Sequence, residues 1–267
     1  MSEEKKLKLE ELVKRLNVMD DTFFHKVAED PKVCEEMLRV FLQDKELVII
    51  SSTPQKYLRN VENRSVILDV YCEGANQRKY AVEMQRGDYD DHQKRVRYIG
   101  SNVDTRITEK GIDFKDIPDV YLIYLTKFDV FGKGRTTYHI NRTIQETGDM
   151  VDNGFHEIYV NAEIDDGSET AQLMQYIRHT EGRNEAFKKL SDRVQYLKER
   201  GDVTMCDLVE EYAKQYAAEV VEKTVEAEKQ SIAELFKNGV SLELVLKSMK
   251  TLDKETIQEI YREVTKS

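Results

Sequence analysis

Two short runs of alternating apolar and polar residues predict a β-hairpin. The runs are 66–72 and 80–85, and the segment 73–77 between them includes Gly74 and Asn76, which favour a turn. Because side chains alternate across a strand, the apolar residues of each run lie on one face. We therefore expect the two strands to pair with their apolar residues on the same face of the sheet.

This pairing predicts a specific register. Its three apolar pairs are Cys72–Tyr80, Val70–Val82 and Leu68–Met84. The same register places Asp69 opposite Glu83 on the other face, and a slip of one residue would mix the two faces. Directly opposed like charges repel, so a divalent cation held by both carboxylates would account for the arrangement. The pattern alone instead favours a solvated hairpin face that carries Asp69, Glu83 and Gln85.

Helices and strands are expected on both sides of the hairpin. Before it, apolar spacing and capping residues predict a helix at 5–16, a short helix through Phe23–Val27, a helix from Pro31 to Leu42 and an extended segment at 48–58. After it, the pattern predicts a helix from Tyr89 to Lys110 that Gly111 ends, a buried central strand at 119–125, and strands at 136–144 and 155–162.

The last hundred residues are expected to be mostly helical. A long, Glu- and Lys-rich helix is predicted through Leu208 and Val220 to Gly239. Two short helices follow, 242–249 and 255–264, with Ser241 and Asp253 as their caps. They resemble a helix-turn-helix only weakly, because the last helix has few basic residues. We expect a domain at 1–200 and a helical extension at 201–267, whose helices are a candidate surface for homo-oligomers.

Composition narrows the class of protein. The chain of 267 residues has no apolar run near the length of a membrane span and begins without the apolar core of a signal peptide, so we expect a cytoplasmic protein without a membrane partner. The three cysteines, Cys34, Cys72 and Cys206, have neither disulfide nor zinc spacing and are expected to be buried. The five histidines form no metal-ligand set either.

The net charge of −10 argues against simple non-specific DNA binding, which depends on neutralised phosphates. The charge is uneven, however. Residues 56–110 hold 11 Lys and Arg against 9 Asp and Glu, whereas residues 200–267 hold 10 against 14. The hairpin region is therefore the least acidic part of the chain, and a DNA-binding function remains open.

Seven short motifs then carry a family resemblance. In chain order they are Asp20-Asp21-Thr22-Phe23-Phe24, Ile67-Leu68-Asp69-Val70, Val82-Glu83-Met84-Gln85, Lys94-Arg95-Val96-Arg97-Tyr98, Lys110-Gly111, Tyr138-His139-Ile140 and His156-Glu157-Ile158-Tyr159-Val160-Asn161. The chain resembles the PD-(D/E)XK nuclease family transposases, relatives of the recombination-promoting nucleases, from about Asp20 to Cys206. The resemblance implies an α/β fold with a restriction-endonuclease-like α-β-β-β-α-β core, a mixed sheet flanked by helices, before the helical C-terminal extension.

The resemblance also implies a function. It is that of a Mg²⁺-dependent DNA endonuclease linked to transposition or recombination, in which Mn²⁺ is expected to substitute for Mg²⁺. Asp69, Glu83 and the backbone carbonyl of Met84 would hold the metal. Asp21 is a candidate third acidic ligand with Asp20 as its competitor, and the alternative role of either residue is to cap a helix.

Three further residues are expected to assist. Gln85 stands where many members of the superfamily carry a Lys, and Gln can orient a water but cannot stabilise hydroxide by charge. Arg95 and Tyr98 are expected to contact a DNA phosphate, whereas Arg97 points elsewhere on the helix. The alternative is a catalytically weak or inactive nuclease-fold protein that serves as an interaction or assembly module.

Overall fold

The computed structural model describes residues 13–59, 65–88, 91–108, 110–199, 224–225, 227–249, 252 and 254–266. The chain divides into two compact units, 1–206 and 207–267. The domain boundary expected between residues 200 and 201 lies outside the described residues and stays a prediction. Among the described residues, no helix combines the length and apolar composition that a membrane span requires.

The first unit is built around a six-stranded mixed sheet with the strand order β1-β2-β3-β4-β8-β5. The strands are β1 (Ile49–Leu58), β2 (Val66–Gly74), β3 (Lys79–Gln85), β4 (Val120–Thr126), β8 (Phe155–Asn161) and β5 (Thr137–Ile140). Strands β1, β2 and β3 form an antiparallel meander, β4 and β8 run parallel to β3, and β5 is antiparallel to β8.

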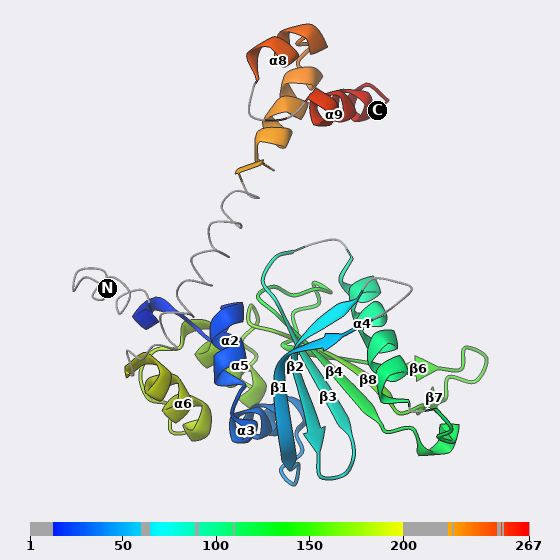
Figure 1. Cartoon of the computed structure of the whole chain (residues 1–267), viewed down its shortest axis with the longest axis vertical. Helices are drawn as coiled ribbons and strands as arrows, with labels where there is room; N and C mark the ends of the chain where they lie inside the picture. Colours follow the sequence, from blue (N-terminus) through cyan, green and yellow to red (C-terminus); the bar gives the residue numbers. More distant parts are fainter. Residues whose placement is uncertain are drawn as a thin grey trace. The chain divides into compact units, whose positions relative to one another are not determined.

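Helices cover both faces of this sheet (Figure 1). Helix α4 (His92–Ile107) lies on one face, and the other face carries α2 (Asp21–Val27), α3 (Pro31–Leu42) and α5 (Glu169–His179). Helix α6 (Lys188–Glu199) packs on α2 and α3. The expected α-β-β-β-α-β order is confirmed by α3, β1, β2, β3, α4 and β4. The mixed α/β fold with helices flanking the sheet is therefore as expected.

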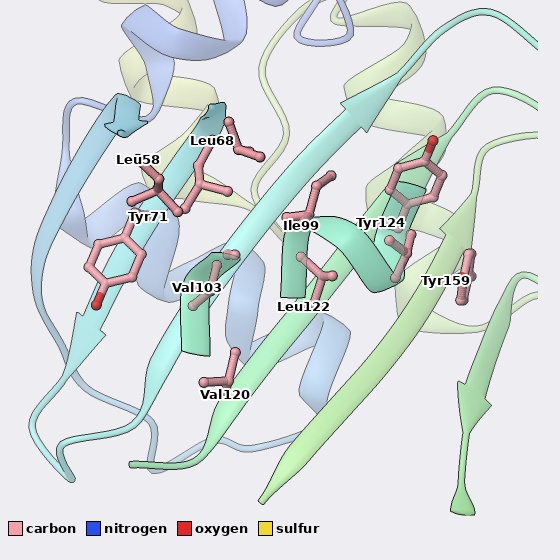
Figure 2. Packing of buried hydrophobic residues seen from close by; sticks show 12 residues of the cluster. Leu58, Leu68, Tyr71, Ile99, Val103, Val120, Leu122, Tyr124 and Tyr159 are labelled. Atoms are coloured by element: carbon pink, nitrogen blue, oxygen red, sulfur yellow. The ribbon is translucent and has the colours of Figure 1, made fainter. Parts of the chain in front are cut away.

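The core under α4 explains why this helix docks on the sheet. Val96, Ile99 and Val103 recur on one side of the helix and pack on Leu122 and Tyr124 of β4 in one buried cluster (Figure 2). Ile123 and Leu125, which alternate with them, are also buried, so β4 is covered on both faces as expected.

The hairpin register is confirmed over part of its length. Cys72 pairs with Tyr80 and Val70 pairs with Val82, but the ladder ends there, and the expected Leu68–Met84 pair does not form. Strand β3 continues to pair with β4 as far as Gln85, while β2 continues to pair with β1 as far as Val66. The two strands therefore separate beyond the Val70–Val82 pair, and each stays paired with its outer neighbour. We call this separation between β2 and β3 the fork.

Two element boundaries differ from the prediction. Helix α4 begins at His92 and ends at Ile107, because Thr108 adopts an extended backbone before Gly111 is reached. The strand expected at 136–144 is two strands, because β5 stays with β8 while β6 (Arg142–Thr143) leaves to pair with β7 (Met150–Val151). Residues 89–90 and 109 lie outside the described residues.

The second unit has a small helical core of its own. Residues 227–237 are helical, followed by α8 (Leu242–Ser248) and α9 (Lys254–Lys266). Ile232, Phe236, Val245 and Ile257 form its buried cluster. Ser241 caps α8 by accepting a hydrogen bond from the Leu244 N–H, as expected. The expected helix through Leu208 and Val220, the expected cap Asp253 and Cys206 lie outside the described residues.

Candidate active site

Two carboxylates span the fork between β2 and β3. The backbone N–H of Asp69 donates to Glu83 Oε1 at 3.3 Å, and the backbone N–H of Met84 donates to Asp69 Oδ2 at 2.7 Å. Each acid thus accepts a hydrogen bond from the opposite strand, beyond the last ladder pair. The register correctly predicted that Asp69 and Glu83 come together, but the two residues meet across a fork instead of as a ladder pair.

The interpretation of this hairpin face as solvated is wrong for two of its three polar residues. Glu83 is 3% exposed and Gln85 is 8% exposed, because β3 is an inner strand between β2 and β4. Only the Asp69 side chain retains substantial exposure, at 24%. Hairpin alternation could not reveal this burial, because the covering α4 is contributed by a later part of the chain.

The buried pair has unusual electrostatics. Burial raises the pKa of the Glu83 carboxyl well above its usual range, and the charge of nearby Asp69 raises it further. The hydrogen bond from the Asp69 backbone and the charge of Arg95 act in the opposite direction. A cation between the two acids would favour the charged form of Glu83, which the protein alone disfavours.

Gln85 lies at the end of β3, two residues beyond Glu83 and next to Thr126 of β4. Its Nε2 donates to the Gly87 carbonyl at 2.9 Å, which fixes the side-chain amide against its own chain. Because side chains alternate along a strand, Gln85 and Glu83 share a face of β3. Its predicted role in orienting a water stays a prediction.

The acids at the start of α2 are held by an arginine. Asp20 occupies the N-cap position, yet its side chain makes no capping bond to α2 and instead accepts from the Asn17 N–H and pairs with Arg86 at 3.2 Å. Arg86 also lies 3.4 Å from Asp21. Burial raises the pKa of Asp21, and Asp69 and Asp20 raise it further, against the opposing charges of Arg86 and His25. The charge of Asp69 therefore acts on the Asp21 carboxyl.

His25 is a neighbour of the site that the sequence interpretation missed. It follows Asp21 by four residues, so both project from the same side of α2. Its Nε2 lies 3.6 Å from Asp69 Oδ1, and neither ring nitrogen has a hydrogen-bond partner among the described residues. The four-residue spacing from Asp21 was the available sequence signal.

A pocket of about 490 Å³ opens next to Glu83. One wall belongs to the start of β2, where Ser65, Val66 and Ile67 line the pocket, and the other belongs to α4. The pocket is lined on this side by Asp91, the N-cap residue of α4, and by four residues of the helix, Lys94, Arg95, Tyr98 and Ile99. Arg95 and Tyr98 were expected here and Lys94 was not, although it stands in the same motif. Arg97 does not line the pocket, as its position on the helix predicted.

The donor set fits a hard divalent cation that keeps most of its waters. Among the described residues, no three His, Cys, Asp or Glu side chains gather in the geometry of a complete metal site. Mg²⁺ is commonly bound through one or two carboxylates and retains waters, which matches the pair Asp69 and Glu83. A site that required a full protein shell, such as structural zinc, does not fit these residues.

A protein-family model matches most of this chain. The model of the PD-(D/E)XK nuclease family transposases matches residues 22–199, which include both strands of the fork and α4. Searches of curated proteins and of solved structures gave no match. Because the match spans most of the chain and contains Asp69, Glu83 and Arg95, the protein belongs to the PD-(D/E)XK nuclease family transposases.

Proposed function

We propose that this protein is a metal-dependent DNA endonuclease that acts in transposition or recombination. The observation that carries the proposal is the pair Asp69 and Glu83, interlocked across the fork by the two backbone hydrogen bonds. Two carboxylates that share a partly buried position need a compensating cation, and this family is one of nucleases. DNA is the proposed substrate.

In this proposal Asp69, Glu83 and the carbonyl oxygen of Met84 hold Mg²⁺, for which Mn²⁺ substitutes. The bound ion would supply activation of a water and stabilisation of charge on the scissile phosphate. The hydrogen bonds from the Met84 and Asp69 backbones orient the carboxylates before any ligand arrives. Asp21 is proposed as a further acid at this site, with Arg86 setting its position.

The residues around the pair are proposed to orient the water and to contact the DNA. Gln85, buried and tied to the Gly87 carbonyl, orients the attacking water by hydrogen bonding. Arg95 and Tyr98 contact a phosphate of the DNA from the α4 wall of the pocket, and Lys94 adds a second positive charge there. Gln cannot supply the charge of a Lys, so we expect slow cleavage.

Cleavage of supercoiled plasmid with Mg²⁺ or Mn²⁺ tests this proposal. We expect the wild type to nick the plasmid and Glu83→Gln to lose at least about 100-fold in rate, because metal-based charge stabilisation contributes several kcal/mol. Glu73→Gln is the matched control, since Glu73 lies on β2 outside the fork and pairs with Lys79. Equal cutting by wild type and Glu83→Gln would contradict the assignment.

The competing function is an interaction or assembly module that has kept the nuclease fold. Isothermal titration calorimetry separates the two, because the nuclease must bind Mg²⁺ or Mn²⁺ and the module need not. We expect heat of binding from the wild type and none from Glu83→Gln. No measurable metal binding, together with no cleavage of plasmid, duplex or single-stranded DNA, would favour the module.

A further inference from the structure

Three rings stack in a row across the inner strands of the sheet, on the face away from α4. Tyr80 of β3, Tyr121 of β4 and His156 of β8 are paired in register. The ring centroids are 5.3 Å apart between Tyr80 and Tyr121 and 4.3 Å apart between Tyr121 and His156, at interplanar angles of 26° and 20°. Ala81 and Leu122, the next residues of β3 and β4, pack in the cluster under α4, so the row projects from the opposite face.

A pocket of about 260 Å³ borders this row of rings. All three rings line it, together with His139 and Asn141 at the side of β5. Strand β5 lies beyond β8, and its ladder with β8 ends one residue before Asn141, which follows as the position opposite His156. One face of the His156 ring stacks on Tyr121, so the other face is directed towards β5. The row thus ends at the pocket, at a position that this chain fills with an amide instead of a ring.

Hydrogen-bonding groups around this pocket are not used by the fold. Among the described residues, the side chains of His139, Asn141 and His156 make no hydrogen bond. An amide carries both donors and an acceptor, and a neutral imidazole carries one of each. A ligand in the pocket therefore gains hydrogen bonds without breaking any in the protein.

The charges of the pocket favour an uncharged ligand. Its lining residues include one cation, Arg78, and two acids, Asp44 and Glu157. Arg78 Nε lies 3.5 Å from Asp119 Oδ2. Glu157 Oε1 lies 4.0 Å from a guanidinium nitrogen of Arg142. A phosphate group would meet no unpaired cation among these lining residues, so the ligand is held by its ring and its polar edge.

The size of the pocket suits one planar ring system. Pockets for drug-sized ligands measure about 300–1,000 Å³, and this pocket falls just below that range. A nucleobase combines a π-face, which stacks on aromatic side chains, with an edge of hydrogen-bond donors and acceptors. The amide of Asn can bond to adenine through both a donor and an acceptor. A nucleic-acid strand is disfavoured, because its phosphates need cations that this lining lacks.

We propose that this pocket binds a free adenine-type base or nucleoside. The ring of the ligand stacks on His156 as the fourth ring of the row, and its polar edge bonds to the amide of Asn141. Glu83 shares a face of β3 with Ala81, so the proposed nucleoside site and the proposed catalytic pair lie on opposite faces of the sheet. The inference goes beyond the proposed nuclease function and does not depend on it.

Isothermal titration calorimetry of the full chain with adenosine, in EDTA, tests the inference. We expect the wild type to bind adenosine and to give no heat with ribose, which lacks the base. His156→Ala should weaken adenosine binding by about 5- to 100-fold, the range for the loss of one base–aromatic stack. His156→Phe keeps a ring at this position and should retain most of the affinity, which separates stacking from a general loss of structure.

Asn141→Phe is the sharpest variant, because its ring would occupy the place proposed for the ligand. Asn141 is exposed, so we expect this variant to keep the melting temperature of the wild type and to lose adenosine binding. His179→Ala is the matched control, since it removes an exposed histidine of α5 outside the pocket, and it should bind as the wild type does. A wild type that does not bind adenosine, or an Asn141→Phe variant that binds it equally well, would overturn the inference.

Two further arms identify the occupant and keep the inference apart from the nuclease. An oligo(dA) strand that binds more tightly than adenosine, and loses this affinity in Asn141→Phe, would overturn the free nucleoside as the occupant. Glu83→Gln should bind adenosine as the wild type does, because it changes the other face of the sheet. Plasmid cleavage without adenosine binding would overturn this inference alone, and adenosine binding without cleavage would contradict only the nuclease.

Discussion

Glu83 is the central residue of the proposed site, and its burial and the nearby charge of Asp69 favour its protonated form. Its carboxyl is buried on β3, faces the negative charge of Asp69 and has Arg95 as the opposing charge. Burial of a like-charged pair lowers the stability of the fold, so a pair of this kind points to a functional role. Strained electrostatics of this kind are common at active sites.

This electrostatic state predicts a pH effect on the metal-free protein. Because the pKa of Glu83 is raised on folding, the folded state retains a proton that the unfolded state releases at pH values above about 4.3. Stability should therefore fall as pH rises from there towards the folded pKa. Glu83→Gln should remove this decline, so that its melting temperature exceeds that of the wild type at pH 8 and matches it near pH 4.

Thermal unfolding in EDTA across this pH range measures the effect. Glu73→Gln is the control, because folding shifts the pKa of Glu73 in the opposite direction to that of Glu83. The hydrogen bond and charge of Lys79 lower the pKa of Glu73, so this residue stabilises the fold above its unfolded pKa. Removing its charge should leave the protein unchanged or slightly less stable at pH 8. A Glu83→Gln variant that is less stable than the wild type at pH 8 would contradict the buried-charge account.

At the scale of elements, the fork and α4 create the site together. Strand β2 stays with β1, strand β3 stays with β4, and the acids lie where the two pairs separate. Helix α4 then closes the pocket with Lys94 and Arg95. The position of α4 is fixed by the apolar contacts of Val96, Ile99 and Val103 with the sheet, so its polar side faces the pocket.

Arg95 and Arg97 give a test at this scale, because both are exposed on the same helix and only Arg95 lines the pocket. We expect Arg95→Ala to weaken DNA binding and to reduce the slope of log affinity against log salt by about 0.7 to 0.9, the loss of one phosphate contact. Arg97→Ala should leave the slope unchanged. Anisotropy titrations at several salt concentrations measure both, and equal effects from the two variants would contradict the pocket as the phosphate site.

The hydrophobic pattern predicted most helices and strands, but it predicted less well where strand pairing ends and which polar residues are buried. The hairpin register held for Val70 and Val82, because apolar alternation decides which faces pair. The end of the ladder could not be predicted, since it depends on β4, which pairs with β3 from a distant part of the sequence. The burial of Glu83 was missed for the same reason. His25 and Lys94 were missed because single side chains near a site leave little trace in hydrophobic periodicity.

At the scale of the whole chain, the matched family region and the proposed site fall in the first compact unit. The match at 22–199 contains the fork, the pocket and α2, and residues 207–267 form a second unit with the separate core of Ile232, Phe236, Val245 and Ile257. The helical extension expected from residue 201 rests on the shift to Glu- and Lys-rich sequence and stays a prediction. The net charge of −10 also suits a protein whose proposed substrate contacts are confined to one pocket.

The most direct test of the account is the position of Mn²⁺ in crystals of the full chain. Anomalous scattering should show an ion bound between Asp69 and Glu83, with oxygen ligands from both side chains at about 2.0–2.6 Å. Crystals of Glu83→Gln soaked in the same way should lack the peak. Wild-type crystals in which Mn²⁺ binds elsewhere, or in which the two carboxylates remain hydrogen-bonded without an ion, would contradict the central claim that this pair is a metal site.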